Sequence, residues 1–216
     1  MVGSDRPRGL LVAIEGADGA GTTTQAARLS EWLAARGRSV HLTREPSSGA
    51  VGVLIRAVLS GAHPGLDPAA LALLFAADRL DHLGREIAPA LAGGAVVVSD
   101  RYVMSSLVYQ SLEVDAGFVG DINRRAAPPD LTVLIDVPPE VAAERRARRG
   151  GKPELFEEDE VQRRVIASYR RHAQAAGAAG QDVVIVDGTA DEQSVFARLR
   201  AEVARRLGIA REEQVA

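Results

Sequence analysis

The chain has 216 residues, enough for one domain with a buried core. Its 26 Lys and Arg residues nearly balance 29 Asp and Glu residues, and the net charge of −3 excludes a general attraction to nucleic acid or to anionic membranes. The absence of cysteine excludes disulfides and thiolate metal sites, and no apolar run reaches the roughly 18 residues of a membrane span. We therefore expect a cytoplasmic protein.

Five short and almost continuously apolar runs are typical of strands that are covered on both faces. They are residues 10–15, 39–43, 95–100, 131–136 and 182–187. Segments of helical period separate them, which indicates right-handed crossovers between parallel strands. The sequence thus predicts an α/β fold: one doubly wound domain over residues 10–208, with a five-stranded parallel sheet, helices on both faces, and flexible tails at 1–9 and 209–216.

The longest helical pattern covers residues 66–91. Asp67 is the expected N-cap and Pro68 the first helical residue. Proline suits this position because the N–H group that it lacks would have no partner within the helix. The apolar residues that follow recur at spacings of three and four. We expect one long helix.

Polar groups follow the first three strands directly: Glu15 and Gly16, then residues 43–46, then Asp100 and Arg101. In doubly wound folds, ligands bind beyond the carboxyl ends of the strands. Their common position at this edge favours a functional role for all three groups.

The segment IEGADGAGTTTQ, Ile14–Gln25, nearly matches the phosphate-binding pattern G-x-x-x-x-G-K-[ST]. Thr23 stands at the position of the magnesium-binding hydroxyl, but Thr22 stands where the pattern has lysine. The alternative is a glycine-rich turn without a ligand. We expect the loop to bind the phosphates of a nucleoside triphosphate through Gly16, Ala17, Asp18, Gly19, Ala20, Gly21, Thr22, Thr23 and Thr24.

Two carboxylates accompany this loop. Asp18 would repel a triphosphate, so we expect it to point towards a second substrate or a magnesium ion; the alternative is a turn aspartate that bonds its own backbone. Asp100 is the expected carboxylate for a hydrated Mg²⁺ facing Thr23, and its alternative is a structural ion pair with Arg101.

With this loop, the segments TREP, FAADR, DRYVMSSLVYQ and PDLTVLIDVPPEVAAER follow one another in an order and spacing that resembles bacterial thymidylate kinase, from about Leu10 to Asp187. The resemblance implies transfer of the γ-phosphoryl group of ATP to dTMP, giving dTDP, with Mg²⁺ as cofactor. It also implies a homodimer. Neither nucleic acid nor a membrane is an expected partner.

The resemblance assigns roles to two helical segments. Phe75 would stack on thymine and Arg79, one turn later, would bond the base edge or its surroundings, although an aromatic residue in such an apolar helix is more often part of the core. The resemblance places four further residues at the thymine edge and deoxyribose, with a partly exposed polar helix as the alternative: Ser105, Ser106, Tyr109 and Gln110. Tyr109 would block a 2′-hydroxyl.

Arg101 leaves the sheet where the acceptor phosphate would lie, and its planar fork suits two phosphate oxygens. Arg44 could approach the same group. Glu45 and Pro46 would form a turn lining the acceptor site, with a cis peptide as one option. Ser47 and Ser48 replace the two glycines that usually follow this motif in the family, which leaves the shape of the turn open.

Residues 144–157 correspond to the mobile lid of the bacterial enzymes and contain the only lysine, Lys152. We expect Arg145 and Lys152 to bind ATP, and Arg148 and Arg149 to act in catalysis with Asp18 and Arg101. The hypothesis is that the lid supplies the positive charge that Thr22 lacks. The alternative is a solvated basic helix face.

Two other functions stay open. One is a kinase of the same build for another pyrimidine nucleotide, such as dUMP. The other is a nucleotide-binding protein with little catalysis, which Thr22 favours.

Overall fold

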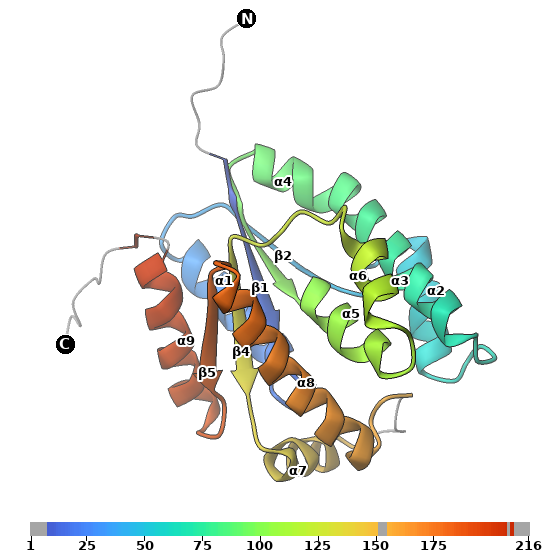
Figure 1. The fold of residues 1–216 in the computed structure, drawn as a ribbon. Helices are drawn as coiled ribbons and strands as arrows, with labels where there is room; N and C mark the ends of the chain where they lie inside the picture. The colour runs from blue at the N-terminus through green and yellow to red at the C-terminus, as the bar shows by residue number, and fades with distance from the viewer. Residues whose placement is uncertain (1–7, 151–154, 207, 210–216) are drawn as a thin grey trace, which may run out of the picture.

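The computed structural model describes residues 8–150, 155–206 and 208–209 (Figure 1). Five strands form one parallel sheet in the order β2-β3-β1-β4-β5. They are β1 (Leu10–Glu15), β2 (Val40–Arg44), β3 (Val96–Asp100), β4 (Leu131–Asp136) and β5 (Val183–Asp187). The predicted α/β fold is confirmed, with strand ends within one residue of the expected ones.

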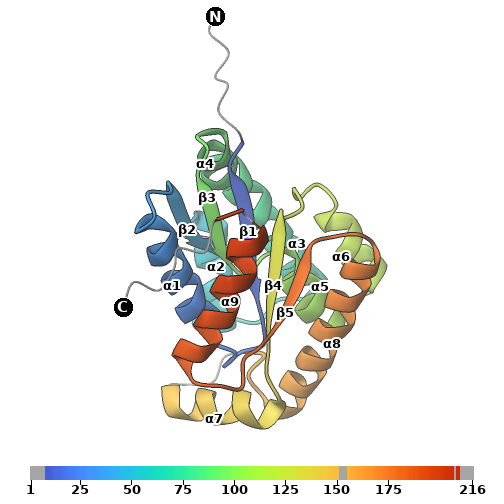
Figure 2. The same ribbon diagram turned by 90° about the vertical axis from the view of Figure 1, so that its left-hand side faces the viewer.

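The helices of the described residues pack in layers on the two faces of this sheet (Figures 1 and 2). They are α1 (Thr22–Ala34), α2 (Ala50–Leu59), α3 (Pro68–His82), α4 (Ala88–Ala92), α5 (Val103–Tyr109), α6 (Ala116–Asn123), α7 (Pro139–Arg149), α8 (Asp159–Ala178) and α9 (Glu192–Arg206). None of these helices is long and apolar enough to cross a bilayer. Figure 2 shows α1 and α9 in front of the sheet.

Alternate residues of β1 pack into different apolar clusters, because successive side chains of a strand point to opposite faces. Val12 belongs to the cluster that contains Leu29 of α1, and Leu11 belongs to the cluster that contains Leu91 of α4. Both faces are covered, which explains why β1 is apolar at almost every position.

The predicted helix start at Asp67 is confirmed. Its carboxylate accepts hydrogen bonds from the backbone N–H groups of Ala69 and Ala70 at 2.9 and 3.2 Å, and Pro68 is the first helical residue. The expected long helix is divided: a π-helical turn, Leu83–Ile87, joins α3 to α4. The widened turn lies just before Pro89, which has no N–H to donate to a carbonyl one turn earlier.

The first three strands end level with one another. Ile14 of β1 and Arg44 of β2 both lie opposite Asp100 of β3. Beyond these positions the Arg101 N–H donates to the Ile14 carbonyl at 2.8 Å, and the Glu45 N–H donates to the Asp100 carbonyl at 3.0 Å. The three polar segments of the sequence therefore start from one edge of the sheet, as predicted.

Most of both predicted tails, and Lys152 with its three neighbours, lie outside the described residues. The domain boundaries and the extent of the lid stay predictions.

Candidate active site

The glycines of residues 16–21 are required by space and by backbone conformation. A Cβ on Gly16 would lie 2.9 Å from the Ala20 Cβ and 3.0 Å from the Ile135 carbonyl oxygen. Gly19 and Gly21 have φ of 93° and 94°, a conformation that other residues rarely adopt. The loop wraps tightly and leads into α1, whose first residues face a cavity of about 690 Å³.

This donor cavity, as we call it, is basic along much of its wall. Residues 17–25 form its floor. Its arginines come from four different parts of the chain: Arg44, Arg56, Arg101, and Arg145, Arg148 and Arg149 of α7. Backbone N–H groups at a helix N-terminus, surrounded by guanidinium groups, form a site for a polyanion.

Thr23 and Asp100 meet in this cavity. The Thr23 hydroxyl donates to Asp100 Oδ2 at 2.5 Å, whereas Asp100 Oδ1 is buried without a hydrogen-bond partner. An unpartnered buried carboxylate oxygen is costly unless a ligand completes it. No group of three or more His, Cys, Asp or Glu side chains in the described part of the chain forms a metal cage. This pair fits Mg²⁺, which commonly takes one or two protein oxygens beside phosphates and water.

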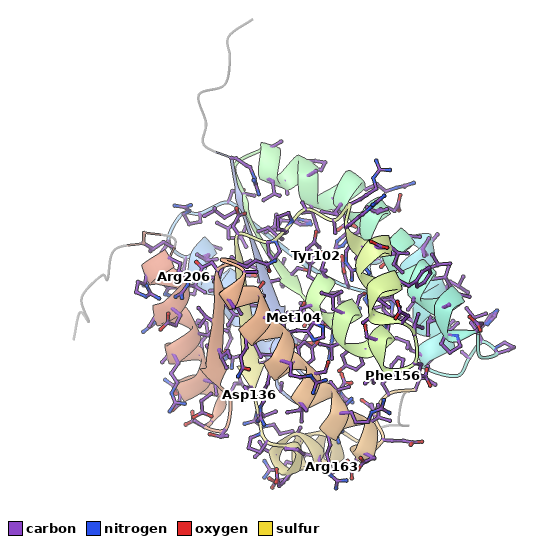
Figure 3. All side chains as sticks on the ribbon, in the orientation of Figure 1. Tyr102, Met104, Asp136, Phe156, Arg163 and Arg206 are labelled. Carbon is purple, nitrogen blue, oxygen red and sulfur yellow. The ribbon has the colours of Figure 1, made fainter. Side chains whose placement is uncertain are left out.

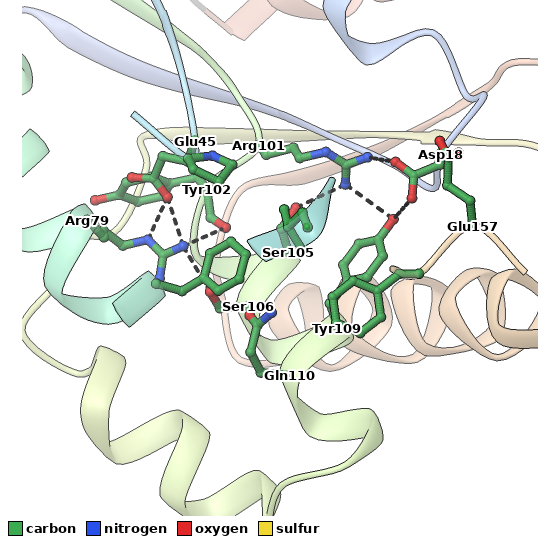
Figure 4. A pocket seen from close by; sticks show the side chains of 14 residues that line it. Asp18, Glu45, Arg79, Arg101, Tyr102, Ser105, Ser106, Tyr109, Gln110 and Glu157 are labelled. Atoms are coloured by element: carbon green, nitrogen blue, oxygen red, sulfur yellow. Dashed lines mark hydrogen bonds and ion pairs between the residues drawn. The ribbon is translucent and has the colours of Figure 1, made fainter. Parts of the chain in front are cut away.

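A second, smaller pocket adjoins the first one (Figure 4). We call it the acceptor pocket. It is lined by Asp18, Glu45, Pro46, Leu59, Phe75, Arg79, Arg101, Tyr102, Ser105, Ser106, Tyr109, Gln110, Phe156 and Glu157. Five of these residues also line the donor cavity: Asp18, Glu45, Pro46, Leu59 and Arg101. The two pockets therefore meet at an ion pair, Asp18 with Arg101.

This ion pair is held from several sides. Arg101 Nη2 donates to Asp18 Oδ1 at 2.5 Å, and the Tyr109 hydroxyl donates to Asp18 Oδ2 at 3.0 Å. Gln162 of α8 donates to the same Oδ2 at 2.9 Å and accepts from the Asp18 N–H at 3.1 Å. Asp18 thus points away from its own loop and bonds side chains of three other segments.

Arg79 is buried beneath the acceptor pocket, with 2% of its side chain exposed. Its Nε donates to Glu45 Oε2 at 2.8 Å, and its Nη2 donates to the Ser106 hydroxyl at 3.0 Å. Further bonds go to Asn123 and to the Tyr102 carbonyl. Most of its N–H groups are therefore engaged within the protein, and the residue ties α3 to the turn after β2 and to α5. The Glu45–Pro46 peptide bond in this turn is cis.

The thymidylate kinase family model matches residues 14–199. A probable thymidylate kinase of Thermococcus gammatolerans is 45% identical over 174 residues, covering 77% of this chain and 84% of the relative. One of Thermococcus kodakarensis is 38% identical over 207 residues, covering 92% and 99%. The thymidylate kinase of Leifsonia xyli is 38% identical over 208 residues, covering 94% and 97%.

The chain belongs to the thymidylate kinase family.

The thymidylate kinase residues expected from the sequence fall into the two pockets with few exceptions. Gly16 lines neither pocket; its carbonyl accepts a hydrogen bond from Arg101 Nη1 at 3.0 Å. Arg44 lines the donor cavity and not the acceptor pocket. Helix α5 ends at Tyr109, so Gln110 lies in the 3-10 turn that follows, Gln110–Leu112.

The basic side chains of α7 are tied to the protein in different ways. Arg145 donates to the carbonyls of Gly188 and Ala190 at 2.8 and 3.1 Å. Arg148 pairs with Glu144 at 2.5 Å, and Arg149 pairs with Glu157. Arg145 is thus fixed to backbone, while its two neighbours form ion pairs with carboxylates.

Several residues of the site carry no recognisable signal in the sequence. Arg56 lines the donor cavity from α2 and donates to the carbonyls of Pro46 and Ser47. Gln162 and Tyr169 of α8 reach Asp18 and Arg101 across 144 and 68 positions of the chain. Only their helical spacing of seven, which places them on one face, is readable from the sequence.

Glu15 lies at the end of β1 and is completely buried. Burial raises the pKa of its carboxyl to about 7, although hydrogen bonds from Ser105 and Tyr102 and the charge of Arg101 oppose the rise. Its Oε1 accepts from the Tyr102 and Ser105 N–H groups at 2.9 and 3.3 Å, and its Oε2 accepts from the Ser105 hydroxyl at 2.6 Å. A buried carboxylate with this set of donors anchors the start of α5 to the sheet.

His82 is another buried titratable group near the acceptor pocket, and its pKa is also raised. Its ring lies 2.7 Å from the Thr43 hydroxyl and 3.3 Å from Glu45 Oε1. Burial lowers its pKa, but the carboxylates of Glu45, Glu86 and Asp78 outweigh burial and raise the pKa above its usual value of 6.5. The folded protein therefore holds the His82 proton more tightly than the unfolded chain does.

The proton on His82 should make stability depend on pH. A raised pKa stabilises the fold fully below pH 6.5, and this contribution is lost as the pH rises through the folded-state pKa. We expect His82→Gln to lower the free energy of unfolding at pH 6 by about 1–3 kcal/mol, because buried partners lose a hydrogen bond. The difference from the wild type should shrink towards pH 9, as measured by urea unfolding.

The matched control is His63→Gln, since His63 is exposed and bonds only the neighbouring Pro64 carbonyl among the described contacts. This variant should follow the wild-type profile. A loss at His82 that is the same at pH 6 and pH 9 would contradict the role of the proton.

Proposed function

We propose that this chain transfers the γ-phosphoryl group of ATP to dTMP, giving dTDP for dTTP synthesis. The observation that carries the proposal is the junction of the two pockets at Asp18 and Arg101, in a chain that belongs to the thymidylate kinase family. A donor and an acceptor bound in these pockets would meet beside one guanidinium group. Phosphoryl transfer depends mainly on such positioning and on cancelling negative charge.

On the donor side, the backbone N–H groups of residues 16–24 hold the ATP phosphates together with the N-terminus of α1. Thr23 and Asp100 hold Mg²⁺. When bound, the ion neutralises negative charge that develops on the phosphate oxygens. The free Oδ1 of Asp100 supports this assignment.

On the acceptor side, Arg101 binds the phosphate of dTMP, and Phe75 lies on the pocket wall where its ring can stack on thymine. The Tyr109 hydroxyl is held by Asp18. A fixed aromatic ring at this point excludes a ribose with a 2′-hydroxyl. Arg79 acts beneath the base, through Glu45 and Ser106.

A coupled assay with ATP, Mg²⁺ and a panel of dTMP, dUMP, UMP and dCMP tests the proposed function. We expect kcat/KM for dTMP to exceed that for dUMP by about tenfold or more, the usual worth of a methyl group in an apolar pocket. UMP should be used least. ATP binding without turnover of any monophosphate would instead indicate a nucleotide-binding protein, and preference for dUMP would change the substrate.

We further propose that Arg148 and Arg149 of α7, with Lys152, take the role of the lysine that Thr22 replaces. Both arginines line the donor cavity, whereas Thr22 is buried at its floor. The ion pair of Arg148 with Glu144 is exposed on both sides, and such a pair contributes little to stability. Arg149 is itself more than half exposed, although its partner Glu157 is mostly buried. A triphosphate with higher charge density would compete successfully for the same guanidinium groups.

Removal of these side chains should slow turnover. We expect Arg148→Ala, Arg149→Ala and Lys152→Ala to lower kcat, with the triple variant losing about a thousandfold, as for other arginines that reach a transferring phosphoryl group. Thr22→Lys should raise or preserve kcat in the wild type and recover part of the loss in the triple variant. Steady-state kinetics at saturating ATP and dTMP measure kcat for each of these variants.

Arg163→Ala is the control for loss of positive charge. Arg163 lies on α8 outside both pockets, exposed and paired with Glu160 (Figure 3). If all three single variants and the triple variant keep the wild-type kcat, the proposal that lid side chains take the role of the missing lysine is refuted.

We also propose a homodimer that forms through α2 and α3. Exposed apolar side chains of these two neighbouring helices are Val53, Leu54, Leu73 and Leu80. Leu73 and Leu80 are seven residues apart and share one side of α3. The cytoplasmic location expected from the sequence stays a prediction.

Sedimentation velocity should show a dimer for the wild type and a monomer for Leu73→Asp with Leu80→Asp, because burying two carboxylates in an apolar interface is costly. Ile185→Asp is the control, since Ile185 is similarly exposed but lies on the edge strand β5. A wild-type monomer at micromolar concentration would contradict the proposal.

A further inference from the structure

Arg101 is held in an unusual backbone conformation. Its φ of 71° is positive, which is not seen for any other non-glycine residue in the described part of the chain. Such a conformation costs about 1–3 kcal/mol and persists where surrounding contacts impose it. Here the Arg101 N–H bonds the Ile14 carbonyl, and its own carbonyl accepts from the Ser99 hydroxyl at 2.7 Å. The backbone conformation thus directs the Arg101 side chain towards the junction of the pockets. It does not fix the orientation of the guanidinium group.

The orientation comes from the contacts of the two terminal nitrogens. Nη2 donates to Asp18, and Nη1 donates to the Gly16 carbonyl at 3.0 Å and to the Tyr169 hydroxyl at 3.1 Å. Tyr109 also lies near Nη1, but at 3.4 Å, and its hydroxyl is engaged with Asp18. Tyr169 is therefore the closest side-chain acceptor for Nη1 among the described residues.

The Tyr169 hydroxyl belongs to a chain of hydrogen bonds that ends at Glu15. It lies 2.7 Å from the Ser105 hydroxyl, which lies 2.6 Å from Glu15 Oε2; the direct distance from Tyr169 to Glu15 is 3.2 Å. A hydroxyl donates one hydrogen bond and accepts two. The shortest contacts therefore give one direction: Tyr169 donates to Ser105, and Ser105 donates to Glu15. Both lone pairs of the Tyr169 oxygen are left to accept from Arg101.

Tyr169 does not contact a ligand in either pocket. Its side chain is 1% exposed, and it is absent from the lining of both cavities. Its ring packs edge-on against Tyr109, with centroids 6.1 Å apart. On the same face of α8, Gln162 holds Asp18. Helix α8 thus forms hydrogen bonds with both Asp18 and Arg101, the two members of the ion pair at the junction.

We propose that Tyr169 is a positioning residue for the acceptor phosphate: its hydroxyl, aligned by Ser105 and Glu15, fixes the Arg101 guanidinium at the junction of the pockets. The inference rests on the proposed role of Arg101. It predicts an effect that depends on the phosphate group and not on the nucleoside.

Titration calorimetry with dTMP and with thymidine separates these contributions. Tyr169→Phe keeps the ring and removes the hydroxyl, so dTMP should bind about three- to tenfold more weakly, the usual effect of one hydrogen bond, while thymidine binding changes less than twofold. The matched control, Ser168→Ala, removes a neighbouring buried hydroxyl of α8 that lies 3.3 Å from His172 Nδ1. It should leave both affinities unchanged.

Two further variants show whether the effect passes through Arg101 and the hydroxyl chain. In an Arg101→Lys background, which itself should lose affinity for dTMP but not for thymidine, Tyr169→Phe should cause no further loss. Glu15→Gln keeps the shape of the carboxylate. Because two N–H groups require an acceptor at Oε1, the amide nitrogen of Gln would face Ser105, and the same phosphate-dependent loss should follow. This second variant also serves if Tyr169→Phe folds poorly.

The inference is overturned if Tyr169→Phe and Glu15→Gln both retain wild-type affinity for dTMP while Arg101→Lys loses it. An equal loss of dTMP and thymidine affinity would also overturn it, because that result indicates a general disturbance of the pocket. Unchanged dTMP affinity in Arg101→Lys would instead refute the proposed role of Arg101 itself.

Discussion

The arrangement of the site depends on the ion pair between Asp18 and Arg101. Asp18 belongs to the glycine-rich loop after β1, and Arg101 follows β3, so their contact joins the two walls of the junction between the pockets. Both side chains are only about one fifth exposed, and a buried charge is tolerated where it is paired and hydrogen-bonded. Tyr109, Gln162 and Tyr169 supply those further bonds. The protein's own side chains therefore hold both members of the ion pair in place.

A second buried pair supports the acceptor pocket from below. Arg79 and Glu45 are almost completely buried, and together with His82 they connect α3 to the end of β2. Removing one partner of such a pair would leave an uncompensated charge in the interior. The same turn is also tied to Asp78 of α3. Ser47 bonds Asp78 through both its N–H and its hydroxyl.

The positive charges of the donor cavity come from other parts of the chain than in a site whose phosphate loop contains a lysine. No amine comes from Thr22, and the arginines that line the cavity come from α2, α7 and two strand ends. Several of them are bonded to carbonyls or carboxylates of the protein. A guanidinium on a helix can exchange such a partner for a phosphate oxygen. The catalytic charge of this enzyme would then depend on the position of α7, and not only on the loop.

The strands, the phosphate loop and the Asp67 cap could be predicted because each depends on residues close together in the chain. A buried parallel strand is apolar at every position, a phosphate loop needs glycines at fixed spacing, and an N-cap bonds N–H groups two and three residues later. The resemblance added most residues of the acceptor pocket. The division of the long helix at Leu83–Ile87 was missed because the local pattern around Pro89 stays helical.

The sequence by itself determined the α/β sheet, the edge at which the candidate site lies and the residue types present there. Only the tertiary structure decided their partners: that Arg44 faces the donor cavity, that Arg79 is engaged by Glu45, and that Tyr169 reaches Arg101. The reason is physical. Local patterns follow from backbone geometry and burial, whereas the partner of a charged side chain depends on which distant helices pack beside it. Helix α8 packs on β4, β5 and α5, and this packing brings Gln162 and Tyr169 to Asp18 and Arg101.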